Sequence, residues 1–173
     1  ICNGGVLLVD GIEDPEWYSE TLSLISPELS ELQTIKELAQ QALPKSLLHD
    51  ICGLFFYIKH DNPALFAEQL RQVAHPKNIC ILHDRHKVYC LPSMLNKGNA
   101  IERFAKKFGE AISIAAGDSE FDIPMLARAD TRIIPSALER QLPAENTITI
   151  SSSVFSDGIC DYLNTIAKRG TRR

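Results

Sequence analysis

Two aspartates at the end of an apolar run are the residues of this chain best suited to chemistry. The stretch GDSEFDIPML (117–126) follows EAISIAA and places Asp118 and Asp122 four residues apart, where a helix-like pattern begins. A buried carboxylate is costly unless a cation or hydrogen-bond donors accompany it. Carboxylates with water are the ligands that Mg²⁺ prefers, so the pair suits a magnesium site. On spacing alone, a helix cap at Asp118 or Ser119 with Asp122 as a first-turn acid is the commoner arrangement, and it stays open.

A lysine at the start of a predicted helix is the second candidate. In LNKGNAIERF (95–104), Lys97 precedes Gly98 where a loop gives way to a helical pattern. A lysine beside the free backbone N–H groups of a helix N-terminus can hold a phosphate. A solvated surface lysine fits the same residues, so the signal from Lys97 is weak without the aspartates.

Alternating strand and helix patterns in the second half of the chain would position these residues. Strands are predicted at 111–117, 131–135 and 146–151, and helices at 97–109, 122–129, around 136–140 and 157–168. This alternation predicts a parallel sheet covered by helices, with ligands bound beyond the carboxyl ends of its strands. The strand at 111–117 is expected to be buried on both faces, and it would carry Asp118 to that edge.

The first half of the chain has hairpin character instead. A strand at 6–9 is predicted directly after the turn Asn3-Gly4-Gly5, and apolar residues at helical spacing follow to about residue 43. A strand at 52–60, a helix at 62–74 and a hairpin formed by 78–84 and 86–92 are predicted next. Trp17 is expected to pack in a core rather than to stack on a sugar. The boundary between the two halves is placed near Leu91–Pro92. Because the chain begins within an apolar run and without methionine, we expect a fragment of a longer protein.

Composition narrows the class of protein. The 173 residues suffice for one good-sized domain or two small ones, and the formal charge of −4 disfavours binding to nucleic acid or to an acidic membrane. The five cysteines form no CxxC pair, which favours free thiols in a reducing compartment. No apolar window is as long as a membrane span and no signal peptide is visible, so a cytoplasmic protein is expected. Whether it forms a homo-oligomer stays open.

Taken together, these motifs resemble the haloacid dehalogenase-like (HAD) phosphohydrolases, and most of all the Cof-type (subfamily IIB) sugar-phosphate phosphatases. The resemblance covers residues 92–166 and rests on LNKGNAIERFAKKFG, ISIAAGDSEFDIPMLARAD, RIIPSA and SSSVFSDGICDYL. It implies an α/β fold with a Rossmann-like parallel core and an inserted α/β cap of the C2 type. Residues 1–15 would form the edge of the core, 16–91 the cap, and 92–173 the C-terminal part of the core.

The resemblance also implies an activity and a role for each candidate residue. A Mg²⁺-dependent phosphatase, that is, a phosphoric monoester hydrolase, would act on a small phosphorylated metabolite such as a sugar phosphate through an aspartyl-phosphate. Asp118 would bind the metal, and Lys97 would neutralise the phosphoryl oxygens. Asp122 would orient a metal-bound water or pair with Lys97. Asn3 and Asn99 could line the entrance for the substrate.

Two departures from the family pattern matter. Phe121 stands where the family usually has Asn, which would remove a hydrogen bond or a water near the site. The DxDGT motif that carries the family's nucleophile is absent, since Asp10 and Asp14 lack DxD spacing. The nucleophile is therefore expected N-terminal to this chain, and residues 1–173 alone are expected to be poorly soluble or inactive. A non-catalytic HAD-like binding or regulatory module, and a phosphomutase or phosphotransferase on the same scaffold, are the alternatives.

Overall fold

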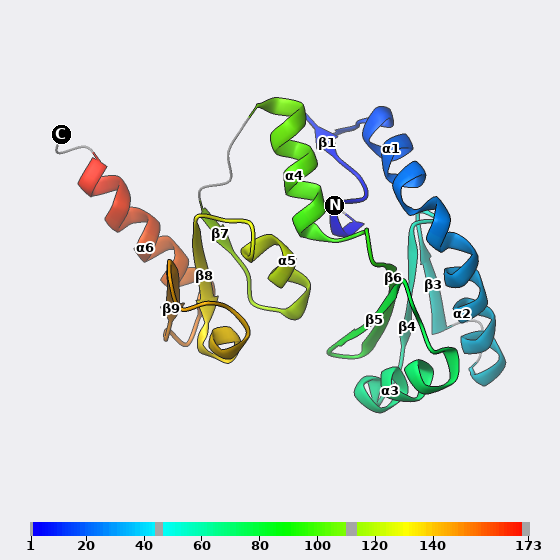
Figure 1. The fold of residues 1–173 in the computed structure, drawn as a ribbon. Helices are drawn as coiled ribbons and strands as arrows, with labels where there is room; N and C mark the ends of the chain where they lie inside the picture. Colours follow the sequence, from blue (N-terminus) through cyan, green and yellow to red (C-terminus); the bar gives the residue numbers. More distant parts are fainter. Residues whose placement is uncertain (1, 44–46, 110–113, 171–173) are drawn as a thin grey trace. The chain divides into compact units, whose positions relative to one another are not determined.

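The chain forms two compact units that meet in the sequence between Leu95 and Asn96. A computed structural model describes residues 2–43, 47–109 and 114–170 (Figure 1). Within these ranges, no helix combines the length and the apolar character needed to cross a bilayer. The assignment of residues 1–15 to the edge of a core and of 16–91 to a cap stays a prediction.

The first unit is built on an antiparallel four-stranded sheet. Its strands lie in the order β3 (Leu48–Ile51), β4 (Phe55–Lys59), β6 (Lys87–Pro92) and β5 (Ile79–Asp84), and every neighbouring pair is antiparallel. The helices of this unit are α1 (Pro15–Ile25), α2 (Leu29–Ala42) and α3 (Pro63–Ala74). The hairpin predicted from 78–84 and 86–92 is confirmed as β5 and β6, whereas β3 was not foreseen.

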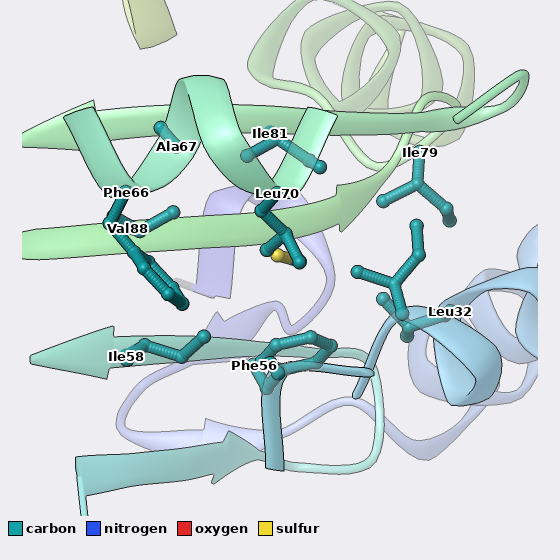
Figure 2. Close-up of a cluster of buried hydrophobic side chains, with 12 residues drawn as sticks. Leu32, Phe56, Ile58, Phe66, Ala67, Leu70, Ile79, Ile81 and Val88 are labelled. Atoms are coloured by element: carbon teal, nitrogen blue, oxygen red, sulfur yellow. The ribbon is translucent and has the colours of Figure 1, made fainter. Parts of the chain in front are cut away.

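Side chains from α2 and α3 and from one face of the sheet form the core of this unit (Figure 2). In α2, Leu32, Ile35 and Ala39 recur at helical spacing and share one face. Alternate strand residues such as Phe56 and Ile58 point to the same side of the sheet. The remaining buried members are Phe66, Ala67, Leu70, Ile79, Ile81, Val88 and Cys90. Because the period of a strand is two, the intervening residues lie on the opposite face of the sheet.

Capping residues define where the helices of the first unit begin. Asp14 accepts a hydrogen bond from the backbone N–H of Trp17 (3.0 Å) at the start of α1, and Pro15 is tolerated at the first helical position. Asn62 caps α3 in the same way, because its Oδ1 accepts a hydrogen bond from the backbone N–H of Leu65 (3.3 Å). Trp17 is 3% exposed and its indole N–H donates to the carbonyl of Gly4 (2.9 Å), so its predicted core position is confirmed.

The predicted strand at 6–9 is wrong in extent. The structure has only β1 (Leu8–Val9), paired antiparallel with β2 (Ile12–Glu13) across the turn Asp10-Gly11. Both turn residues have positive φ (52° and 81°), which is the geometry of an Asp-Gly hairpin turn. This local turn chemistry was overlooked because the apolar run was interpreted as part of a larger sheet.

The second unit contains the predicted parallel sheet. Its strands lie in the order β7 (Ile114–Ala116), β8 (Thr131–Pro135) and β9 (Thr147–Ile150), and both pairs are parallel. The helices are α4 (Lys97–Phe108), α5 (Ile123–Leu126) and α6 (Phe155–Gly170). Residues 111–113 of the predicted strand lie outside the described residues. Ala115 is buried but Ile114 is 38% exposed, so the expected burial on both faces does not hold at Ile114.

Candidate functional site

The loop that follows β7 brings Asp118 to the carboxyl end of the parallel sheet. The backbone N–H of Gly117 donates to the carbonyl of Ile133 on β8 (3.1 Å), which extends the strand pairing by one residue. Asp118 comes next and is exposed. Ligands of open α/β sheets bind beyond the carboxyl ends of the strands, so Asp118 lies where the fold places a ligand.

Asp122 holds this loop closed. The residue is 5% exposed and ends the short 3₁₀ turn Glu120–Asp122. Its Oδ2 accepts hydrogen bonds from the backbone N–H groups of Asp118 (3.1 Å) and Ser119 (3.2 Å) and from the hydroxyl of Ser119 (2.9 Å). This is the reciprocal arrangement of a capping box. The helix-cap alternative left open by the sequence thus holds for Ser119 and Asp122.

The other carboxylate oxygen of Asp122 pairs with Lys97. Lys97 is the first residue of α4, and its ammonium donates to Oδ1 of Asp122. The side chain of Lys97 is 39% exposed, whereas that of Asp122 is 7% exposed. The ion pair therefore joins a buried carboxylate to a lysine whose side chain is partly exposed. Of the two roles considered for Asp122, the structure shows the pairing with Lys97.

Opposing effects act on the pKa of Asp122. Burial raises the pKa, but hydrogen bonds from Lys97 and Ser119, the positive charge of Lys97 and the backbone N–H of Asp118 outweigh burial and lower it. The carboxyl is therefore held ionised, and Lys97 keeps an anionic partner.

Two glycines permit the close packing around this pair. A Cβ on Gly98 would collide with the carbonyl group of Pro124 and with the guanidinium of Arg128. A Cβ on Gly117 would collide with Cβ of Asp122 and come within 2.8 Å of its Cγ. Glycine is therefore required both where α4 approaches α5 and where the loop folds over the carboxylate.

Asn99 belongs to the same cluster as Lys97, although its contacts are structural. The backbone N–H of Asn99 donates to Oδ1 of Asn96, the N-cap of α4 (2.9 Å). Oδ1 of Asn99 accepts from the guanidinium of Arg128 (3.0 Å), which also donates to the carbonyl of Pro124 (2.9 Å). Asn99 thus helps tie α4 to α5, and a contact with substrate stays a prediction.

Asn3 lies in the first unit. Its backbone is left-handed (φ 55°), and its side-chain amide donates to the carbonyl of Leu95 (2.6 Å). This bond joins the turn at Asn3 to the end of that unit. A place for Asn3 at the substrate entrance stays a prediction.

Asp118 is the residue of this site best suited to bind a divalent cation. Among the described residues, no three His, Cys, Asp or Glu side chains cluster so as to hold a metal. Mg²⁺, however, is commonly bound by one or two carboxylates completed by water and phosphate oxygens. An exposed carboxylate at a strand end fits that pattern. Asp122, whose oxygens are engaged by the loop and by Lys97, fits a supporting position better than a ligand position.

The supporting residues of the site were less visible in the sequence. Asn96 is the N-cap of α4, and its side chain accepts a hydrogen bond from the backbone N–H of Asn99. An Asn directly before a helical pattern is a known sign of a helix start, and it could have been used to predict this cap. Ser119 and Asp122 match the capping-box pattern in the same way. Arg128, in the turn after α5, gave no local signal, because its partners Glu102 (2.5 Å) and Asn99 lie in α4, more than 25 residues earlier in the chain.

Comparison with solved structures identifies the fold. The chain is similar to the sucrose-phosphatase (SPP) of Synechocystis sp. PCC6803, solved with sucrose and phosphate, with 17% identity over 94% of this chain and 71% of that protein (TM-score 0.66). It is also similar to yhjK of Bacillus subtilis, a haloacid dehalogenase-like hydrolase protein, with 18% identity over 95% of this chain and 66% of that protein (TM-score 0.52). No protein-family model matches the chain, and no curated protein matches it in sequence. The chain therefore has the haloacid dehalogenase-like fold that its motifs predicted.

Proposed function

We propose that this chain is part of a Mg²⁺-dependent phosphatase that hydrolyses a small phosphorylated metabolite, a sugar phosphate. The observation that carries the proposal is the ion pair of Lys97 with Asp122 beside Asp118 at the carboxyl end of β7. Lys97 offers a positive charge to a phosphoryl group, and Asp118 offers a carboxylate to a metal ion. Both functions are proposed at the carboxyl edge of the sheet, where ligands of such folds bind. The sugar-phosphate class is chosen because a sucrose-phosphatase shares the fold.

In this proposal Lys97 acts on the phosphoryl oxygens. Its ammonium is bonded to Asp122, and its side chain is partly exposed. Phosphoryl transfer depends mainly on positioning and on neutralising charge, so a cation held in place in advance favours the transition state. Asp122 is then a positioning residue: it stays ionised and buried, and it fixes the lysine that contacts the substrate.

Asp118 would hold Mg²⁺ in the same proposal. The ion supplies positive charge for the phosphoryl oxygens and for the attacking group when it is bound. Asp118 contributes one carboxylate from an exposed loop, and its backbone N–H, bonded to Asp122, keeps the loop closed. The hydrogen bonds to Asp122 thus position both Asp118 and Lys97.

The nucleophile in this proposal is an aspartate N-terminal to residue 1 of this chain. It would attack phosphorus and displace the sugar as its free alcohol, which forms an aspartyl-phosphate, and water would then cleave the aspartyl-phosphate to release phosphate and restore the carboxylate. This assignment is supported by the resemblance to the family, whose nucleophile lies in a motif that residues 1–173 do not contain.

Phosphate release from sugar phosphates by the full-length protein, with Mg²⁺ and with EDTA, tests the proposal. We expect activity that requires Mg²⁺ and falls at least about 100-fold in Asp118→Asn, because the metal loses its carboxylate. Asp130→Asn removes another exposed carboxylate of the second unit and should leave activity unchanged. Binding of phosphate without turnover would contradict the proposal and favour a non-catalytic module. Transfer to a sugar hydroxyl in place of water would identify a phosphotransferase.

A further inference from the structure

Two cysteines that lie far apart in the sequence meet in the first unit. Cys2 opens the turn that contains Asn3 and Gly4, and Cys52 lies in the turn between β3 and β4. The neighbouring thiol of Cys52 is among the causes that raise the pKa of Cys2, so the two side chains lie near each other. Both are free thiols, and Cys52 is exposed while Cys2 is half-buried.

Packing holds these two turns together independently of the thiols. Gly5 lies against the side chain of Leu54, so closely that an added Cβ would come within 2.5 Å of its Cδ1. The hydroxyl of Tyr18 on α1 donates to the carbonyl of Cys52 (2.8 Å) and fixes the backbone of the second turn. The two turns that carry the cysteines are therefore held side by side by packing and by a hydrogen bond, and not by the thiols.

The backbone at both cysteines is of a kind that cysteine seldom adopts. Cys2 has φ 51° and Cys52 has φ 54°, both in the left-handed region. Cys52 and Gly53 (φ 66°) are the central residues of a hairpin turn closed by the bond from Leu54 N–H to the carbonyl of Ile51 (2.9 Å). Asn, Asp and Gly are the preferred residues at such positions. A cysteine in this conformation is unfavourable for the turn, and we infer that it serves through the chemistry of its thiol.

We propose that Cys2 and Cys52 form a reversible disulfide when the protein meets a disulfide oxidant such as oxidised glutathione. The thiolate of Cys52 attacks one sulfur of the oxidant, forms a mixed disulfide and releases one glutathione. Cys2 then gives up its proton and attacks the sulfur of Cys52, which releases the second glutathione. The two protein thiols lose two electrons and two protons, and the oxidant is reduced to two glutathione thiols.

The environments of the two thiols determine the order of these steps. Cys52 is exposed and can meet the oxidant directly. Burial and the neighbouring thiol of Cys52 raise the pKa of Cys2, so Cys2 is the less reactive thiol and suits the second, intramolecular attack.

The disulfide would join three segments of the first unit. The turn that contains Cys2 is already bonded to the end of this unit through Asn3 and the carbonyl of Leu95. A covalent link to the β3–β4 turn would fix residues 2–5, 52–54 and 95 relative to one another. Such a link should raise the Tm of the first unit by roughly 5–10 °C, because it restricts the unfolded chain.

Peptide mapping of the full-length protein tests the proposal and requires no enzymatic activity, so it is independent of the proposed phosphatase function. The protein is equilibrated in mixtures of reduced and oxidised glutathione, alkylated, digested and analysed by mass spectrometry. We expect a peptide that contains Cys2 linked to one that contains Cys52, with the loss of two free thiols, and full recovery of both thiols with dithiothreitol.

Single substitutions provide the controls. Cys80→Ser and Cys160→Ser remove other exposed thiols and should leave the cross-link intact, whereas Cys52→Ser should abolish it. Separate glutathione adducts on Cys2 and Cys52 as the final products, or linkage of Cys52 to Cys80 or Cys160, would overturn the proposal. The map of the wild-type protein decides between these outcomes even if Cys52→Ser fails to fold.

Discussion

Lys97 and Asp122 form an ion pair that joins the first turn of α4 to the 3₁₀ turn that follows β7 in the chain. The two oxygens of the carboxylate have different partners, since Oδ1 accepts from Lys97 and Oδ2 accepts from the loop at Asp118 and Ser119. A carboxylate bonded on both sides cannot move without disturbing both the lysine and the loop. The pair therefore couples the position of the cation to the conformation of the loop.

Replacing the lysine should remove activity. Lys97→Ala deletes the cation proposed to neutralise the phosphoryl oxygens, and we expect kcat to fall about 10²–10³-fold. Lys106→Ala, near the end of the same helix and exposed, is the matched control and should retain wild-type kcat. Steady-state phosphate release by the two full-length variants measures the difference. Equal activities would show that Lys97 is a structural residue.

Replacing the buried carboxylate should destabilise the protein in a manner that depends on pH. Asp122→Asn loses the charge-assisted bonds to Lys97 and to the loop, and we expect the free energy of unfolding at pH 7 to fall by about 2 kcal/mol. Because the folded state lowers the pKa of Asp122, its ionised form stabilises the protein above the unfolded pKa of about 3.9. That contribution is lost as the pH falls through the lower pKa of the folded state.

Urea unfolding of wild type and Asp122→Asn between pH 3 and pH 7 measures this effect. The difference between the two proteins should be largest near neutrality and should shrink below about pH 4. Asp130→Asn, at an exposed position, should track the wild type throughout. A difference that does not change with pH would mean that the charge of Asp122 does not contribute to stability.

The close approach of α4 to α5 makes Gly98 sensitive to substitution. Gly98→Ala would drive a methyl group into the carbonyl of Pro124 and the guanidinium of Arg128. We expect overpacking of this kind to cost about 1–3 kcal/mol and to shift Lys97. In Gly109→Ala, nothing lies within 4 Å of the added Cβ, but the positive φ (70°) introduces backbone strain. Both variants should have a lower free energy of unfolding than the wild type, and only Gly98→Ala should also lower kcat.

The core of the first unit should depend strongly on Phe56. This side chain is 1% exposed and belongs to the cluster in Figure 2. Phe56→Ala leaves a cavity and should lower the free energy of unfolding by about 3–5 kcal/mol. Leu65→Ala on the exposed side of α3 is the control, since Leu65 is 53% exposed. Thermal unfolding compares the two, and a similar Tm for both variants would contradict this description of the core.

Much of the fold could be predicted from periodicity and capping residues. The apolar spacing in α2, the Asn62-Pro63 start of α3 and the Gly109 end of α4 are local signals, and the structure confirms all three elements. The β1–β2 hairpin was missed although its Asp-Gly turn is also local, because the apolar residues before the turn were assigned to a larger sheet.

The sequence singled out Lys97, Asp118 and Asp122 as candidates, and the pairing of Asp122 with Lys97 was one of two roles that the family resemblance implied for Asp122. The spacing of Asp118 and Asp122 allowed either a helix cap or a functional pair, and the structure shows that Asp122 is both a cap and the partner of Lys97. That outcome depends on α4 reaching the loop, a contact between segments that spacing does not encode. The link from Arg128 to Asn99 and Glu102 could not be foreseen for the same reason.

The tight closure of the loop at Asp122 constrains its length as well as its composition. One inserted residue between Ser119 and Asp122 would rotate the following side chains by about 120° around the 3₁₀ turn. Oδ2 could then no longer face the two amides that it now binds. Homologous chains that conserve this geometry should therefore vary in residue type at 120 and 121 far more readily than in the number of residues between Ser119 and Asp122.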